Sequence, residues 1–327
     1  MVLMSRLLRL LPAGLTALAL AACGAPASEE DGAAPRVVAA FYPLEWAAGQ
    51  VLGGHGSLSG LTTPGTEAHD LELTAQQIAS LSDADLVLHL AEFQPAVDDA
   101  IAQSGPASVM DVSEVVGLIP AAAAHVDDHA DEAGDGGEHA DETDEHADEA
   151  DDHGDLDPHF WQDPARMATL VEELGARLAE LDPDNAADYT ANAAATAEEL
   201  QALDEEFTTG LATCERREFV TTHAAFGYLA DRYDLTEIGI SGVNPDAEPS
   251  PARIAEIHEE AARHGITTIF FETLTSDAVA TSIAGDLGLE TAVLDPLEGV
   301  TDNSPGTDYP SIMRANLTAL RSANDCA

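Results

Sequence analysis

Short apolar runs that alternate with helical patterns constrain the fold of this chain more than any other feature. Apolar runs at 37–41 and 86–90 are each followed by a segment of helical periodicity. In the second half, four further apolar runs lie between helical segments, at 218–222, 237–240, 267–272 and 291–294. Apolar strands separated by helices are typical of parallel sheets with helices on their faces. The sequence therefore predicts an α/β fold with parallel sheets.

A long helical segment separates the two sets of strands. Residues 185–212 contain no proline, one glycine, and apolar residues that recur every three or four positions. A helix of about 25 residues extends roughly 40 Å, enough to cross a small domain. We therefore expect an N-terminal lobe at 36–184, a rigid linking helix at 185–213 and a C-terminal lobe at 214–327.

The first residues have the pattern of a secretory leader. A short basic region precedes an apolar run, 10–20, that is too short to span a bilayer comfortably. The run ends in Leu-Ala-Ala-Cys-Gly, similar to a bacterial lipobox, so we expect a signal peptide at 1–22 and a lipid on Cys23. An ordinary signal peptide with an incidental cysteine is the alternative, disfavoured because small residues flank Cys23. With a polar tether at 23–35, the protein would be exported and anchored to the outer face of the cell membrane.

Two further cysteines, Cys214 and Cys326, follow the leader. Outside the cytoplasm such a pair is better explained as a disulfide than as reactive thiols, and two unpaired thiols are the alternative. A bridge at the penultimate residue would fix the C-terminus to the second lobe.

The chain is strongly acidic. It has 61 acidic residues against 12 basic ones, all arginine, for a formal net charge of −49 at pH 7. Phosphate backbones are bound by basic patches, so this composition argues against a nucleic acid partner. It suits a soluble protein that attracts cations. An acidic proteome or a saline habitat is the alternative reason for part of the excess.

One segment, 121–155, combines acidic residues with histidine. It has almost no apolar side chain larger than alanine, so it cannot bury a core and we expect it to be disordered. Imidazole and carboxylate are both zinc ligands, so the segment is predicted to collect metal loosely. The alternative is a solvated acidic insert with incidental histidines. Its histidines are His125, His129, His139, His146 and His153.

Four motifs outside this segment place histidine or carboxylate where strands end or helices begin. They are 64–73 with His69, 157–164 with His159, 221–228 with His223, and 294–299 with Asp295 and Glu298. Open α/β sheets bind ligands beyond the carboxyl ends of their strands, so these loops can converge between two lobes. A single histidine at a strand end is more often structural. Three of them, one preceded by a histidine-rich segment, favour a metal site.

In this order and spacing, the four motifs resemble those of the solute-binding proteins of bacterial zinc and manganese ABC importers, the cluster A-I family. The Pro-Gly…His-Asp and Asp-Pro-His-x-Trp sequences are the most specific parts, and the resemblance extends from Arg36 to the C-terminus. It implies two α/β lobes bridged by a long helix, with the metal in the cleft between them. It also implies a metal-loading loop just before the second histidine ligand.

The resemblance further implies which residues bind the metal. The implied ligands are His69, His159, His223 and Glu298. Asp295 is the alternative fourth ligand. Glu67 is a less favoured candidate for that position, and a water molecule could also fill it. Similar manganese carriers have a carboxylate in place of His223, whereas three imidazoles and one carboxylate suit tetrahedral Zn²⁺.

The expected function is capture of Zn²⁺ and its delivery to an ABC-type zinc permease by a monomeric lipoprotein, without catalysis. Transport of manganese or another divalent metal is one alternative. A zinc hydrolase is another, because three histidines and an open position also form catalytic sites. The chain lacks a His-Glu-x-x-His sequence, which disfavours the hydrolase. The third alternative function is a zinc buffer or adhesin, in which the acidic segment 121–155 binds the zinc.

Overall fold

The computed structural model describes residues 34–121 and 156–327. The predicted leader, Cys23 and the five histidines of the acidic segment lie outside the described residues. The described residues from Ala34 onward belong to one compact unit.

The first sheet has four parallel strands in the order β2-β1-β3-β4. Its strands are β1 (Arg36–Ala39), β2 (Ser57–Gly60), β3 (Leu86–His89) and β4 (Val109–Asp111). The helices of this lobe are α1 (Tyr42–Leu52), α2 (Ala75–Asp83), α3 (Pro95–Ser104) and α4 (Ser113–Val116). The central strands β1 and β3 are the buried apolar runs of the sequence, as expected for a sheet covered on both faces.

The apolar pattern of the sequence did not reveal β2 or α2. β2 is an edge strand whose four residues are alternately exposed and half-buried. α2 buries only Leu81, and its start is set by a capping box between Thr74 and Gln77. Elements with so few buried apolar residues carry little periodic signal.

The second sheet repeats the arrangement, with parallel strands in the order β6-β5-β7-β8. Its strands are β5 (Glu218–Thr221), β6 (Thr236–Gly239), β7 (Thr268–Phe271) and β8 (Glu290–Val293). Its helices are α7 (Gly227–Arg232), α8 (Pro251–His264), α9 (Ala278–Leu287) and α10 (Tyr309–Ala323). The sequence pattern predicts a helix over 224–233, but α7 begins only at Gly227, because the N–H groups of Ala225 and Phe226 donate to the Glu237 carboxylate and hold a loop.

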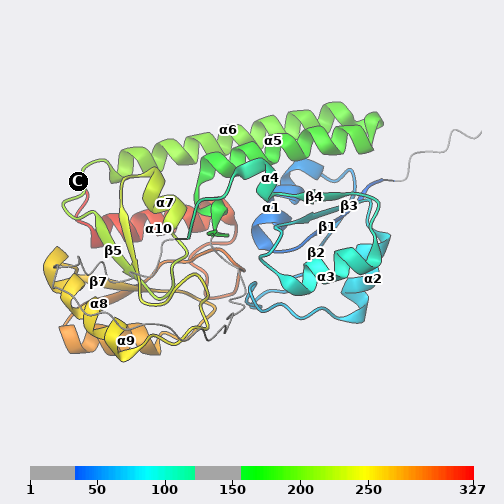
Figure 1. Ribbon diagram of the computed structural model, residues 1–327. Coiled ribbons are helices and arrows are strands. Elements are labelled where there is room, and N and C mark those ends of the chain that lie inside the picture. The colour runs from blue at the N-terminus through cyan, green and yellow to red at the C-terminus, as the bar shows by residue number, and fades with distance from the viewer. Residues whose placement is uncertain (1–33, 122–155) are drawn as a thin grey trace, which may run out of the picture. The chain divides into compact units, whose positions relative to one another are not determined.

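Two long helices lie side by side along the lobes, and the longer of them extends over both (Figure 1). α5 (Pro164–Leu181) starts after Asp163, whose side chain accepts the N–H of Ala165. α6 (Ala186–Leu211) returns alongside α5 and contacts α1 of the first lobe and α10 of the second. The predicted architecture, two parallel-sheet α/β lobes joined by one long helix, is confirmed.

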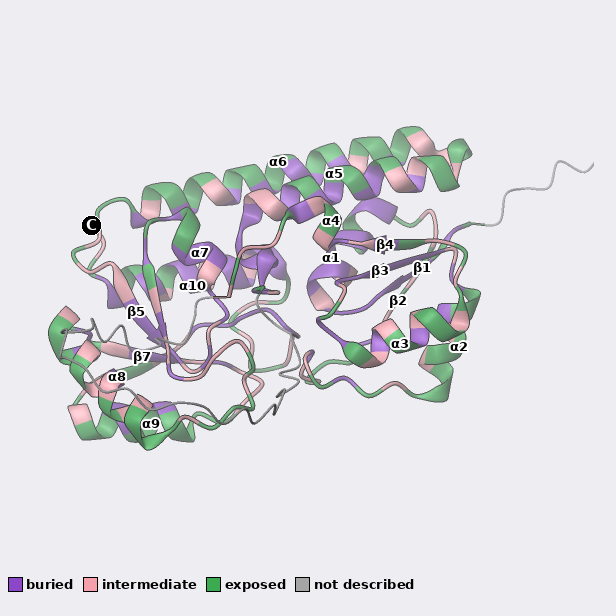
Figure 2. Cartoon of the chain, viewed as in Figure 1, coloured by how far each residue is buried: buried purple, intermediate pink, exposed green. Residues whose placement is uncertain are grey.

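The two lobes share one hydrophobic core. A cluster of buried apolar residues extends from Val37 in β1 through α5 and α6 to Ala323 in α10. A second cluster, which includes Val220, Ile257 and Ile269, fills the space between the second sheet, α8 and α9. Figure 2 shows buried residues recurring along α5 and α6 on otherwise exposed helices. Because close-packed cores resist deformation, the shared core makes the long helices a stiff connection between the lobes.

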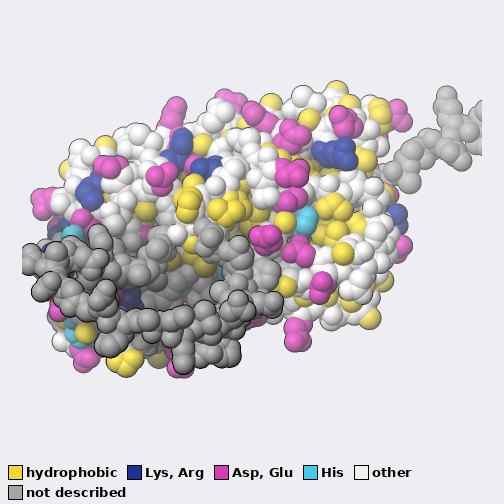
Figure 3. Space-filling model, viewed as in Figure 1, with side chains coloured by type: hydrophobic (Ala, Val, Ile, Leu, Met, Phe, Trp, Pro, Cys, Tyr) yellow, Lys and Arg dark blue, Asp and Glu magenta, His cyan; other side chains and the backbone are white. Residues whose placement is uncertain are grey.

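Acidic side chains are spread over the face shown in Figure 3. Arginine side chains pair with them, as in Arg36–Asp85 and Arg314–Glu206. Exposed pairs of this kind add little stability. Each pair neutralises one arginine, so the remaining acidic side chains leave the surface negatively charged. Within the described part of the chain, no helix combines the length and the apolar character needed to cross a membrane.

Cys214, just after α6, and Cys326, next to the last residue, form a disulfide. The backbone around the bridge is paired as well, since the N–H of Arg216 donates to the carbonyl of Asn324. The C-terminus is thereby held against the start of β5.

Candidate metal centre

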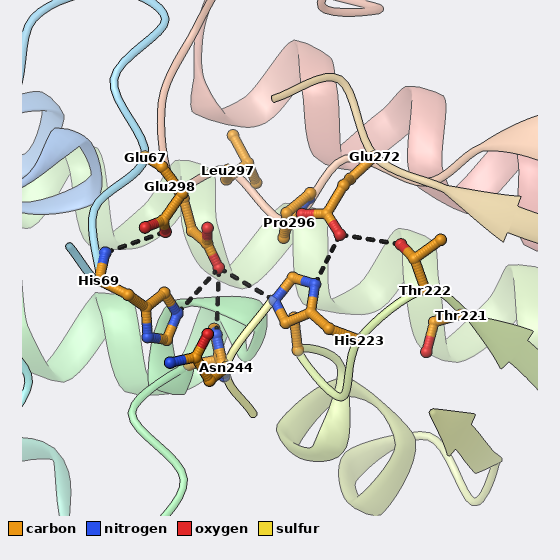
Figure 4. Close-up of polar contacts among 12 residues, drawn as sticks. Glu67, His69, Thr221, Thr222, His223, Asn244, Glu272, Pro296, Leu297 and Glu298 are labelled. Carbon is orange, nitrogen blue, oxygen red and sulfur yellow. Dashed lines mark hydrogen bonds and ion pairs between the residues drawn. The ribbon is translucent and has the colours of Figure 1, made fainter. Parts of the chain in front are cut away.

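The structure brings His69, His159, His223 and Glu298 together. One ligand atom of each lies within 4.8 Å of the others. His223 follows β5 and Glu298 follows β8, whereas His69 precedes α2 and His159 precedes α5. Figure 4 shows the Glu298 carboxylate between the rings of His69 and His223. Four motifs that are far apart in the sequence therefore meet between the two sheets.

The spacing within this cluster matches the ligand shell of one small metal ion. Glu298 Oε1 lies 3.1 Å from Nε2 of His159, 3.2 Å from Nε2 of His223 and 3.4 Å from Nε2 of His69. In a tetrahedral zinc site with bonds of about 2.0–2.1 Å, neighbouring ligand atoms are about 3.3–3.4 Å apart. All three imidazoles present the same nitrogen toward one carboxylate oxygen at about this separation.

Two further carboxylates orient the histidine rings from behind. Asp157 Oδ1 lies 2.8 Å from Nδ1 of His159, and Glu272 Oε1 lies 2.7 Å from Nδ1 of His223. A carboxylate that accepts the Nδ1 proton leaves Nε2 free for a metal and fixes the ring. The sequence reasoning missed both roles. The sequence offered two signals for them. Asp157 lies two residues before His159, and Glu272 follows β7, the strand that pairs with β5.

The cluster is buried and its charges are strongly coupled. His159 and Glu298 have no exposed surface, and His223 is 2% exposed. Burial would raise the pKa of Glu298, but hydrogen bonds from His159 and His223 hold that pKa well below its usual range. Burial would lower the pKa of His159, but Asp157 and Glu298 raise it to about 9. The pKa of His223 is likewise raised well above its ordinary value, against burial, by hydrogen bonds to Glu272 and Glu298.

Some buried polar atoms at this centre lack a hydrogen-bond partner among the described residues. They include Nε2 of His69 and Oε2 of Glu298. Buried polar atoms are normally satisfied, and unpaired ones indicate a missing ion or water. Imidazole nitrogen and carboxylate oxygen are the donor set that Zn²⁺ takes in proteins, so the residues fit that ion.

The loop that carries His69 is held within the first lobe. The Glu67 carboxylate accepts the N–H groups of His69 and Asp70, at 2.9 and 3.1 Å. Gln94 donates to the carbonyl of Ala68 at 2.8 Å. Glu67 therefore caps its own loop, and it groups with Asp70 and an acid of the second lobe rather than with the three histidines.

The alternative fourth ligand, Asp295, lies outside the cluster. Its Oδ1 accepts the N–H of Leu297 at 2.9 Å, and its Oδ2 accepts the hydroxyl of Thr273 at 3.1 Å. Leu297 adopts a left-handed backbone, with φ of 65°, and the next residue is Glu298. Asp295 therefore forms the turn that aims Glu298 at the histidines, so the structure places only the second of the two carboxylates in the cluster.

The comparisons with known proteins point to one family. The model of the family described as "Zinc-uptake complex component A periplasmic" matches residues 37–323. The zinc-binding protein AdcA of Streptococcus pyogenes serotype M3 is 37% identical over 296 residues, which are 89% of this chain and 56% of that protein. The chain thus spans little more than half the length of such relatives. The high-affinity zinc uptake system protein ZnuA of Bacillus subtilis is 34% identical over 314 residues, 93% of each chain.

A solved structure shows the same fold. The crystal structure of Zn(II)-bound AdcA from Streptococcus pneumoniae has a TM-score of 0.71 and 32% identity to this chain. The match covers 89% of this chain and 58% of that one.

Proposed function

Because the chain belongs to the family of zinc-uptake complex component A, we propose that it captures Zn²⁺ outside the cytoplasm and delivers it to an ABC-type permease for zinc uptake. The observation that carries this proposal is the arrangement of three histidine Nε2 atoms at 3.1–3.4 Å from one buried carboxylate oxygen. The names of the relatives, a zinc-binding protein and a zinc uptake protein, support the same cargo.

In this proposal His69, His159 and His223 bind the ion through Nε2 and Glu298 is the fourth ligand. Three nitrogens and one oxygen favour Zn²⁺ over Mn²⁺, which prefers carboxylate, carbonyl and water oxygens. Glu272 supports this choice, because this nearby carboxylate is engaged with Nδ1 of His223 and so does not add an oxygen ligand to the site. Transport of manganese or another divalent ion is the alternative that a selectivity measurement would decide.

The same geometry supports binding rather than catalysis. Catalytic zinc sites keep one coordination position open for water or substrate, whereas closed sites have four protein ligands. Here the four side chains surround one point, and the shared oxygen belongs to a fully buried carboxylate. We therefore propose a carrier and not a zinc hydrolase.

The regions outside the described residues complete the proposal. Cys23 would carry a lipid that anchors a monomeric protein to the outer face of the membrane, near its permease. The five histidines of the acidic segment would collect zinc weakly ahead of the cleft. Changing Cys23 to alanine should release the protein from the membrane fraction, and unchanged retention would refute the anchor.

Isothermal titration with Zn²⁺ tests the central site directly. Single alanine variants of His69, His159 and His223 should each lose more than the roughly 10–100-fold in affinity typical of residues behind the ligands. Glu298→Ala should lose less, because water can replace a carboxylate ligand more readily than an imidazole held in place. His264→Ala is the control, since His264 lies on α8 and pairs with Glu218 and Glu260 instead. Wild-type affinity in two of the three ligand variants would overturn the assignment.

A further inference from the structure

The segment that carries His159 precedes α5, yet it is hydrogen-bonded to the second lobe. The hydroxyl of Tyr228, in α7, donates to the carbonyl of Asp157 at 2.7 Å. The indole of Trp161 donates to the carbonyl of Pro296 at 2.7 Å. The loop of His69, by contrast, is held by Glu67 and by Gln94 of its own lobe.

Asp157 is the contact through which the second lobe reaches His159. One oxygen, Oδ1, accepts the backbone N–H of His159 at 2.9 Å and lies 2.8 Å from its Nδ1. Asp157 is buried, so this pairing is shielded from water. The direction of the His159 ring therefore follows the position of Asp157.

Two residues at the start of α7 lie against Asp157, one at its backbone carbonyl and one at its carboxylate. The Tyr228 hydroxyl donates to its carbonyl and accepts the N–H of Ile119 at 3.0 Å. A Cβ at Gly227 would lie 2.6 Å from Asp157 Oδ2, so any larger residue there would displace this carboxylate. Tyr228 is itself 2% exposed, with the Arg166 guanidinium 4.9 Å from its ring centre. The Asp157 backbone is thus held by Tyr228 of the second lobe, and its carboxylate lies in the space that Gly227 leaves.

We infer that Tyr228, which holds the Asp157 backbone, and Gly227, which leaves room for its carboxylate, are positioning residues that set the orientation of His159 through Asp157. This inference rests on the proposed function of the four-ligand cluster. His223 lies in the connection between β5 and α7, four residues before Gly227. The connection and the start of α7 together therefore supply one ligand and orient another that comes from across the cleft, so displacing this stretch would loosen two ligands at once.

Tyr228→Phe in the full-length mature chain tests the inference, because it keeps the ring and removes only the hydroxyl. Zinc affinity is measured by competition with a chelator, and ligand geometry by the visible absorption of bound Co²⁺. We expect about tenfold weaker zinc binding, the low end of the effect of groups that orient metal ligands, with an altered Co²⁺ spectrum. Gly227→Ala should have a larger effect, because the new methyl displaces the Asp157 carboxylate.

Tyr233→Phe is a matched control. Tyr233 follows the last residue of α7, is buried, and donates its hydroxyl to Asp204 at 2.9 Å, away from the metal cluster. This variant loses the same atom and should keep wild-type zinc affinity and the wild-type Co²⁺ spectrum. An equal loss of affinity in Tyr233→Phe would show that both variants act through general stability, and would overturn the inference.

A double variant shows whether Tyr228 acts through His159. In a His159→Ala background, Tyr228→Phe should have no further effect on zinc affinity. Persistence of the full effect there, or unchanged affinity in Tyr228→Phe alone, would refute the positioning role. If the wild-type chain failed to bind one zinc tightly, the proposed function itself would fail. Should Gly227→Ala not fold, Tyr228→Phe with its control decides the question.

Discussion

Pro120 and Leu156 pair in an antiparallel bridge, next to a hydrogen bond from the N–H of Asp157 to the carbonyl of Ile119 at 2.9 Å. The two ends of the segment 121–155 therefore meet on the described part of the chain, just ahead of His159. A two-residue turn would suffice to join them without moving the ligand segment.

Replacing residues 121–155 with Asn-Gly should leave tight binding of one zinc ion intact and remove additional, weaker sites. The segment has almost no apolar side chain larger than alanine, so ordering its ligands around a metal is expected to cost conformational entropy without burial to offset it. Isothermal titration of both proteins measures the number and affinity of sites. As a control, changing the segment's five histidines to glutamine should remove the same weak sites. Loss of the tight site in either variant would make the segment the main binding element.

Zinc affinity should fall with decreasing pH, and the fall should begin at a higher pH than the range in which an ordinary histidine titrates. The pKa of His159 is raised to about 9 and that of His223 is also raised, so these rings keep protons at pH values where an ordinary histidine has lost them. Metal binds the deprotonated nitrogen, so each displaced proton lowers the apparent affinity about tenfold per pH unit below its pKa. Calorimetry in buffers of different ionisation enthalpy counts the protons released. Constant affinity between about pH 7 and 9 would contradict these raised pKa values.

Asp157→Asn and Glu272→Gln should each weaken zinc binding by about 10–100-fold, although neither residue touches the metal. An amide can donate to Nδ1, which moves the ring proton to Nε2 and blocks the ligand atom. Asp98→Asn is the control, because Asp98 lies 3.0 Å from Nδ1 of His89, outside the metal cluster. Chelator competition should show wild-type affinity for this variant. A comparable loss there would assign the effect to general destabilisation.

Loss of the Cys214–Cys326 disulfide should lower the free energy of unfolding by about 2–4 kcal/mol, because the bridge closes a long loop. Zinc affinity should be unchanged, since α10 remains packed on α6 and Arg216 still pairs with Asp325. Denaturant unfolding of a double alanine variant measures the first effect and calorimetry the second. Thiol labelling of the denatured, unreduced chain without Cys23 should find no free thiol, and two reactive thiols would show that the bridge does not form.

Local signals in the sequence were sufficient for the long helices. The sequence pattern predicts helices over 164–181, 251–264 and 309–323, and α5, α8 and α10 have these bounds. Each begins after a side chain that caps its first turn, with a proline at the start. These caps are Asp163, Ser250 and Asp308. Capping and proline act over three or four residues, so they can be recognised without knowledge of the fold. β2 was missed because its contribution to the fold is pairing with β1, which no local pattern encodes.

The candidate ligands were also predictable, but the carboxylate could not be chosen from the sequence. Asp295 and Glu298 lie three residues apart in the same loop and offer the same chemistry. The structure separates them through the left-handed turn at Leu297 and a hydrogen bond from the Asp295 N–H to the Asn316 side chain in α10. Contacts from α10 therefore decide which carboxylate reaches the histidines.

The sequence by itself determined the α/β class, the long helices and the three histidines, because apolar periodicity, helix caps and short motifs are local properties of a chain. The tertiary structure alone decided that the lobes share a core, that Asp157 and Glu272 orient the rings, and that Tyr228 reaches across to Asp157. Apart from Asp157 and His159, which are two positions apart, these relationships join residues distant in the sequence: 49 positions separate His223 from Glu272, and 71 separate Asp157 from Tyr228. They depend on how packed elements bring backbone and side chains within about 3 Å, and no local pattern specifies such distances.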